Sequence, residues 1–90
     1  MAKKYFGSEF RSKEVIEVDL HGLQVWEAQH QMERLMALIN PVETREIVVI
    51  HGYRNGKRIL RYIREELQDD KIYRKYLSLN QGITSLILKQ

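Results

Sequence analysis

The chain has 90 residues, which is the size of one small domain. Its 43% of hydrophobic and 30% of charged residues argue against wholesale disorder. Without cysteine it has neither a disulfide framework nor thiolate chemistry, and no apolar run approaches the roughly 18 residues of a membrane span. A formal charge of +3 permits a nucleic-acid partner. We therefore expect a cytoplasmic protein with no membrane partner.

The first pattern along the chain is a strand. Residues 1–13 show no period, and we expect a flexible N-terminal tail there, followed by one domain over residues 14–90. From Val15 the sequence VIEVDLH alternates, with its apolar side chains on one face and its polar side chains on the other. This alternation predicts a half-buried strand that ends at Gly22.

The segment 23–40 has a helical period. Its apolar residues fall within an arc of about 100° on a helical wheel: Val25, Ala28, Met32, Leu35, Met36 and Ile39. Trp26 lies outside this arc, and we expect it to pack against a neighbouring element rather than to stack on a base. His30 lies on the polar face and should be at the surface. Asn40-Pro41 ends the helix, because proline cannot donate the next hydrogen bond.

The second half of the chain predicts one more helix and three more strands. EIVVI, residues 46–50, is typical of a central strand covered on both faces, and strand–helix–strand implies a parallel βαβ unit. A second helix is expected from about Gly56 to Gln68, with a buried stripe formed by Ile59, Leu60, Ile63 and Leu67. Residues 72–89 predict two strands around Asn80-Gln81-Gly82, although a parallel pairing of the first of them is also open.

Two His-Gly pairs follow the two strands of the βαβ unit. His21-Gly22 and His51-Gly52 should lie together, because the carboxyl ends of parallel strands meet at one edge of a sheet, where such folds bind ligands. Each pair precedes a predicted helix, whose first N–H groups attract phosphate. The sequence therefore predicts two neighbouring corners, each with an imidazole beside an anion site.

The candidate catalytic residues are Asp19, His21 and His51. The two imidazoles could exchange protons near neutral pH. Asp19 could orient an imidazole, hold a divalent cation or bond a backbone amide of the following turn. The structural alternative makes Asp19 a turn cap and each histidine a loop-bonded residue. We expect no tightly bound cofactor, although Asp19 could hold Mg²⁺ or Mn²⁺.

Cations are concentrated on the second predicted helix. Lys57, Arg58, Arg61 and Arg64 share an arc of about 120° on the wheel, with Arg54 just before them. Such a stripe suits a phosphate backbone, and the alternative is a solvated helix face. Gly56-Lys57 does not belong to a P-loop, because the required first glycine and the Ser or Thr are absent.

Taken in order, these motifs resemble the small MutS-related (Smr) domain family over about residues 14–89. The resemblance is carried by Asp19-Leu20-His21-Gly22, Glu27-Ala28, Ile50-His51-Gly52 with Gly56, Leu60-Arg61, and Asn80-x-Gly82-x-Thr84. One departure concerns the family's His-Gly-x-Gly-x-Gly motif, in which Arg54 takes the place of the middle glycine.

The resemblance implies a fold and a function. The fold is α/β, an α+β two-layer sandwich of order βαβαββ with a mostly parallel four-stranded sheet and two helices. It would be like the C-terminal domain of bacterial translation initiation factor three. The function is binding of DNA or RNA, with endonuclease activity in some members that involves the Asp-Leu-His-Gly residues. The expected nucleic-acid-binding residues are Gly22, Gly52, Arg54, Gly56, Lys57, Arg58, Arg61 and Arg64. The alternative is a non-catalytic adaptor that binds nucleic acid, the ribosome or a protein partner.

Overall fold

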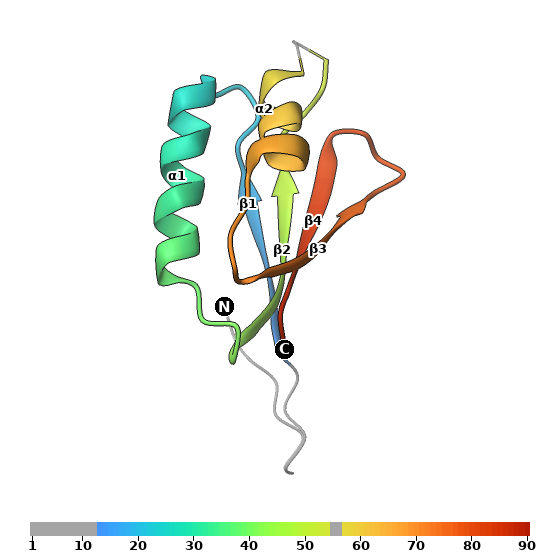
Figure 1. Ribbon diagram of the computed structural model, residues 1–90. Helices are drawn as coiled ribbons and strands as arrows, with labels where there is room; N and C mark the ends of the chain where they lie inside the picture. The colour runs from blue at the N-terminus through green and yellow to red at the C-terminus, as the bar shows by residue number, and fades with distance from the viewer. Residues whose placement is uncertain (1–12, 55–56) are drawn as a thin grey trace.

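The computed structural model describes residues 13–54 and 57–90. The elements are β1 (Glu14–Asp19), α1 (Val25–Leu38), β2 (Thr44–Ile50), α2 (Arg58–Arg61), the π-helical turn η1 (Tyr62–Glu66), β3 (Ile72–Leu77) and β4 (Ile83–Leu88). The helices form one layer and the sheet forms the other (Figure 1). The predicted tail lies outside the described residues except for Lys13, whose ammonium donates to the Pro41 carbonyl at 3.3 Å. Among the helices described, none has the length and apolar composition needed to cross a membrane.

The four strands are ordered β1-β2-β4-β3. The βαβ unit makes β1 and β2 parallel, as predicted, but β4 runs antiparallel to both β2 and β3. The prediction of a mostly parallel sheet is therefore wrong. The physical reason is the short connection between β3 and β4, which allows a hairpin and leaves no room for a crossover. The two strands expected on either side of residues 80–82 are confirmed.

One hydrophobic core lies between the sheet and the helices. Its fully buried side chains come from α1, the second helical segment, alternate positions of β2 and β4, and the residue that follows β1: Leu20, Ala28, Met32, Ile47, Val49, Ile63, Leu86 and Leu88. Ile47 and Val49 of β2 face the helices, whereas Val48 and Ile50 face the opposite side and are only partly buried. The prediction that this strand is covered on both faces is therefore wrong, because both helices pack on the same face of the sheet.

The predicted first helix is confirmed, with a different environment for one residue. Ala28, Met32 and Met36 are buried and His30 is exposed, as the wheel indicated. Trp26 is 67% exposed, so the expectation that it packs against a neighbouring element is wrong. It occupies the first turn of α1, where none of the described elements covers it.

The second predicted helix begins at Arg58 and changes geometry after Arg61. In η1 the Leu67 N–H donates to the Tyr62 carbonyl at 2.7 Å, which is the five-residue spacing of a π-helix. This wider turn departs from 100° per residue, so the α-helical wheel misplaces its side chains. Tyr62 is 5% exposed and belongs to the core, and Arg64 points inward rather than along the basic stripe.

Two lysines bind the carbonyl groups at the helix ends. Lys71 Nζ donates to the carbonyls of Met36 (2.7 Å) and Ile39 (3.2 Å) at the end of α1. Lys75 Nζ, from β3, donates to the carbonyls of Arg64 (3.2 Å) and Leu67 (2.5 Å) around the end of η1. A cation here satisfies carbonyls that the helix leaves unpaired and complements the negative end of its dipole.

Candidate active site

The two His-Gly corners lie against each other. Gly22 has φ +83° and Gly52 has φ +73°, values that side-chain-bearing residues rarely adopt. A Cβ on Gly52 would lie 3.4 Å from the Cβ of His21, so the two turns are in van der Waals reach. The Gly82 carbonyl of the β3–β4 hairpin accepts from the N–H groups of both His51 and Gly52, at 2.9 and 3.0 Å. The predicted proximity of the two corners is present, and the hairpin supports the second one.

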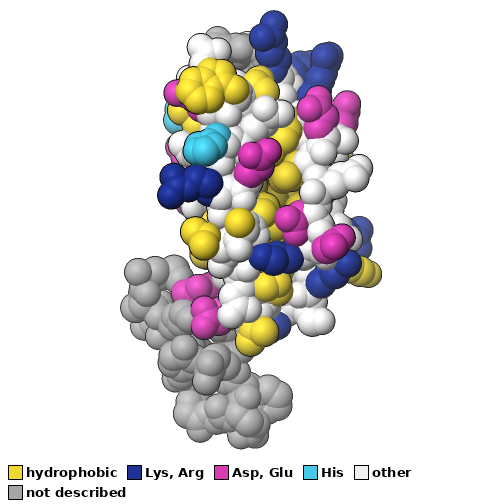
Figure 2. All heavy atoms as spheres, turned by 60° about the vertical axis from the view of Figure 1, so that its left-hand side comes forward, with side chains coloured by type: hydrophobic (Ala, Val, Ile, Leu, Met, Phe, Trp, Pro, Cys, Tyr) yellow, Lys and Arg dark blue, Asp and Glu magenta, His cyan; other side chains and the backbone are white. Residues whose placement is uncertain are grey.

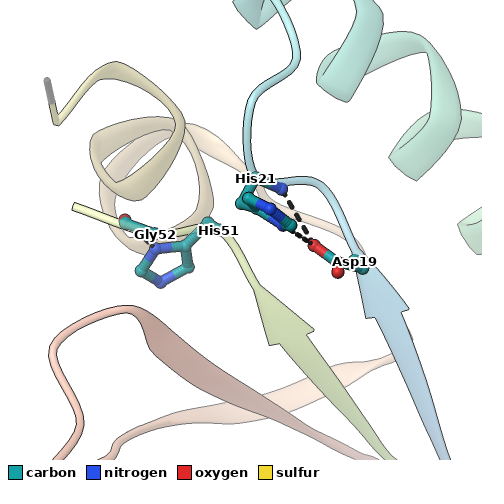
Figure 3. A network of polar contacts seen from close by, with 4 residues as sticks. All are labelled: Asp19, His21, His51 and Gly52. Atoms are coloured by element: carbon teal, nitrogen blue, oxygen red, sulfur yellow. Dashed lines mark hydrogen bonds and ion pairs between the residues drawn. The ribbon is translucent and has the colours of Figure 1, made fainter. Parts of the chain in front are cut away.

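Asp19 and His21 form a carboxylate–imidazole pair at the first corner (Figure 3). Asp19 Oδ1 lies 2.5 Å from His21 Nδ1 and also accepts from the His21 backbone N–H at 3.1 Å. The chain turns after Asp19, the last residue of β1, which brings the two side chains into direct contact. Asp19 thus performs two of its three predicted roles, orienting an imidazole and bonding an amide of the turn. Hydrogen bonds from the His21 side chain and backbone lower the pKa of the Asp19 carboxyl.

His51 has a different environment. It is 4% exposed, its Nδ1 lies 2.8 Å from the Gly52 carbonyl, and its Nε2 lies 2.8 Å from Thr84 Oγ1. Arg64 Nε donates to the same Thr84 oxygen at 2.8 Å. Figure 3 shows the His51 ring turned away from the Asp19–His21 pair. Both ring nitrogens of His51 are therefore engaged within the protein.

The partners of His51 define its tautomer. The Gly52 carbonyl can only accept, so His51 Nδ1 carries the proton of the neutral imidazole and donates it there. Nε2 is then the acceptor, and the Thr84 hydroxyl donates to it while accepting from Arg64 Nε. Burial lowers the pKa of His51, and the nearby Arg64 guanidinium lowers it further, while the bond to Gly52 opposes this shift. The described geometry favours a neutral, structural His51; its predicted exchange of protons with a substrate stays untested.

The Asp19–His21 pair lies at a cavity of about 910 Å³. This volume lies within the range of small-ligand sites. Both corners and the β3–β4 hairpin contribute polar and apolar residues to the cavity. Its lining includes Asp19, His21, Gly22, Leu23, Gln24, Val25, Ile50, His51, Gly52, Tyr53, Arg54, Arg58, Ile59, Asn80, Gly82 and Ile83. The edge of the sheet predicted to bind ligands is therefore hollowed.

The predicted nucleic-acid-binding residues fall into three groups. Gly22, Gly52, Arg54 and Arg58 line the cavity, and Lys57 and Arg61 are exposed outside its lining. Gly56 lies outside the described residues. Arg64 is partly buried and donates to Thr84 and to the Ile83 carbonyl, so it is separate from the exposed cations. Figure 2 shows Lys and Arg side chains gathered at the end of the molecule where α1 begins.

The helix N-termini contribute less to anion binding than the sequence indicated. At α1, the Glu27 carboxylate accepts from the Gln24 N–H at 2.9 Å, as in a capping box, and places a negative charge at the predicted phosphate site. The α-helical part of the second helix has only the four residues Arg58–Arg61, too few for a substantial dipole. Attraction of a phosphate therefore rests mainly on Arg54 and Arg58.

A divalent cation would find limited support from the protein. Asp19 is the carboxylate among the lining residues, and within residues 13–54 and 57–90 no three His, Cys, Asp or Glu side chains group in a manner suited to a metal ion. Mg²⁺ often binds to one or two carboxylates together with substrate phosphates. A metal ion at this site would thus depend on Asp19 and on oxygens supplied by the substrate.

Two residues of the candidate site were not identified from the sequence. The role of Thr84 as the link between Arg64 and His51 was not anticipated, although Asn80-x-Gly82-x-Thr84 carried part of the resemblance. Tyr53, a 40% exposed residue on the cavity wall, was also not singled out. Its position directly after His51-Gly52 was the available signal.

Comparison with known proteins supports the fold. No family model matches the chain, and no curated protein matches its sequence. Among solved structures, the Smr domain of Thermus thermophilus MutS2 is similar at a TM-score of 0.71 and 24% sequence identity, over 82% of this chain and 98% of that one. The predicted likeness to the C-terminal domain of translation initiation factor three is not supported by these comparisons. The chain therefore has the fold of a Smr domain, as the motifs indicated.

Proposed function

We propose that this protein binds nucleic acid and cleaves a phosphodiester bond at the Asp19–His21 pair. The observation that carries the proposal is the 2.5 Å contact between Asp19 Oδ1 and His21 Nδ1 beside a cavity that Arg54 and Arg58 also line. The similarity to the Smr domain of MutS2 agrees with a nucleic-acid partner. Whether RNA or DNA is cut depends on the nucleophile that the site activates, which is the 2′-hydroxyl of RNA or a water molecule in the case of DNA.

Asp19 prepares His21 for proton transfer. When Nδ1 donates to the carboxylate, the proton of a neutral imidazole is held on that nitrogen and Nε2 keeps its lone pair. Nε2 can then accept a proton from the 2′-hydroxyl of RNA as its oxygen attacks the adjacent phosphorus. The leaving 5′-oxygen takes a proton from water, because His51 has both nitrogens engaged.

Arg54 and Arg58 supply the positive charge. The attacked phosphate gains negative charge in the transition state, and guanidinium groups at the cavity wall stabilise it. DNA has no 2′-hydroxyl, so its cleavage needs an activated water. A divalent ion held by Asp19 and by phosphate oxygens would provide that water. Dependence on metal therefore distinguishes the two reactions.

The test uses end-labelled single-stranded RNA and supercoiled plasmid, each with Mg²⁺ or with EDTA. His21→Ala should reduce cleavage at least about a hundredfold, since general base catalysis contributes on the order of 10² to 10⁴. His30→Ala is the matched control, because His30 is exposed on α1 and does not line the cavity. Asp19→Asn should retain binding and reduce cleavage, because an amide orients the imidazole less well.

The outcomes separate the candidate functions. RNA cleavage in EDTA that disappears in His21→Ala supports the metal-independent reaction, and plasmid nicking that requires Mg²⁺ supports the metal-assisted one. Binding of nucleic acid without cleavage would leave the non-catalytic adaptor. Arg54, which replaces the glycine of the related motif, would then be the first residue to revert to glycine.

A further inference from the structure

Trp26 is an exposed aromatic residue in the first turn of α1, next in sequence to the cavity lining but not itself part of it. It is 67% exposed, and the two residues before it, Gln24 and Val25, line the cavity. Side chains on an α-helix lean toward its N-terminus and cover the preceding turn. The Trp26 indole in the first turn of α1 therefore leans toward the Gly22–Gln24 rim.

The cavity next to this turn of α1 has residues that suit one kind of ligand. Tyr53, 40% exposed, brings a second aromatic ring to the cavity wall, and Arg54 and Arg58 bring positive charge. Single exposed apolar residues are common on protein surfaces. Aromatic rings beside a cationic cavity are the combination that binds single-stranded nucleic acid, where cations contact phosphates and rings stack on bases.

We propose that the site selects single-stranded nucleic acid by stacking Trp26 on an unpaired base while the adjoining phosphate lies at His21, Arg54 and Arg58. This inference rests on the proposed function and specifies its substrate class. In a duplex the bases are stacked on one another, so the indole has no free base face to contact. Single-stranded RNA and single-stranded DNA both provide that face.

Trp26 also reports on its own contact, because it is the one tryptophan in the chain. We would titrate the protein with a single-stranded oligonucleotide, as RNA and as DNA, and with the matching duplex while following tryptophan emission. Stacking should quench the emission with the single strands and leave it nearly unchanged with the duplex. Affinities measured in parallel by anisotropy of a labelled oligonucleotide give an independent reading of binding.

Substitution tests the energy of the contact. Trp26→Ala should weaken single-strand affinity roughly 5- to 150-fold, the equivalent of one stacked base, and leave duplex affinity unchanged. Trp26→Phe should restore most of the loss. Tyr73→Ala is the matched control, since Tyr73 is also 67% exposed but lies on β3, a strand that contributes no residue to the cavity lining. Circular dichroism checks that each variant is folded.

The two levels of the proposal fail in different ways. Absence of binding to every single strand and duplex would overturn the proposed function and this inference together. Equal affinity for single strand and duplex, unquenched emission, or an unchanged Trp26→Ala variant would overturn the inference alone. A loss of single-strand affinity as large in Tyr73→Ala as in Trp26→Ala would also overturn the inference, because the effect would then not depend on the position of Trp26.

Discussion

Thr84 connects three elements through one hydroxyl group. It is fully buried on β4, accepts from Arg64 of η1 and contacts His51 at the end of β2. Thr84→Val keeps the shape of the side chain but leaves His51 Nε2 without a donor and Arg64 Nε without its acceptor. We expect a loss of about 1–3 kcal/mol in the free energy of unfolding, measured by urea denaturation.

Ser85→Ala is the control for this variant. Ser85 is also buried, but it lies on the opposite face of β4, beside Val48 of β2. Its substitution should cost clearly less than Thr84→Val. An equal loss of unfolding free energy in both variants would mean that any substitution at a buried position of β4 is destabilising. The hydrogen bonds that join Arg64, Thr84 and His51 would then contribute no additional stability.

His51 should make stability depend on pH. Burial, followed by the Arg64 charge, lowers the pKa of His51 in the folded protein below that of an unfolded histidine, near 6.5. Between these two pKa values the unfolded chain binds more protons, so the stabilising contribution of His51 is complete above pH 6.5 and is lost as the pH falls toward the lowered value. We expect the melting temperature to fall as the pH decreases through about 6.5 toward the lowered pKa of His51.

The comparison of two histidine variants isolates this effect. His51→Gln should lower the melting temperature at neutral pH and flatten its decline with acid, because the titrating group is gone. His30→Gln, which removes an exposed histidine, should leave the decline as it is. If the melting temperature of His51→Gln keeps the full pH dependence, other groups cause that dependence and protonation of His51 does not.

At the scale of elements, Lys75 should stabilise the end of η1. Burial lowers the pKa of the Lys75 ammonium, which donates to the Arg64 and Leu67 carbonyls. Lys75→Met keeps the apolar stem but leaves these carbonyls without the donor, so we expect a loss of about 1–3 kcal/mol in urea denaturation. Arg74→Met, at an exposed neighbouring position of β3, should change stability by less than about 0.5 kcal/mol.

The elements could be predicted wherever one period governed the sequence. The alternation of β1 and the 3.6-residue period of α1 indicated both elements nearly to their ends, because burial on one face decides those patterns. The π-turn has no such signature, and Arg64 within it lies apart from the exposed cations, bonded to Thr84. The direction of β4 depended on the hairpin connection, which strand composition does not encode.

The site could be predicted in part for the same reason. The parallel β1–β2 pair brings Asp19, His21 and His51 to one edge, as the order of elements implied. The difference between the two histidines could not be predicted, because the partner of His51 is Thr84, 33 residues away on another strand. Trp26 was misassigned since a helical wheel shows which side of a helix is polar but not whether a neighbour covers it.

For the whole molecule, the distribution of charge should govern binding. Four exposed cations lie in the cavity lining or near it in sequence: Arg54, Lys57, Arg58 and Arg61. Because phosphates bind to these cations, the affinity for nucleic acid should fall as the salt concentration rises. The double variant Lys57→Ala, Arg61→Ala should reduce the slope of log affinity against log salt by about 1.4 for a single strand, at about 0.7 for each phosphate that is no longer neutralised.

The control moves the same change of charge to the far end of the molecule. Arg45 near the start of β2 and Lys89 just after β4 are exposed at the end of the sheet opposite the cavity, because β2 and β4 are antiparallel. Arg45→Ala with Lys89→Ala lowers the net charge equally and should leave the salt slope unchanged. Equal slopes in the two double variants would show that net charge alone attracts the nucleic acid, and the cations beside the cavity would lose their role in positioning the phosphate at His21.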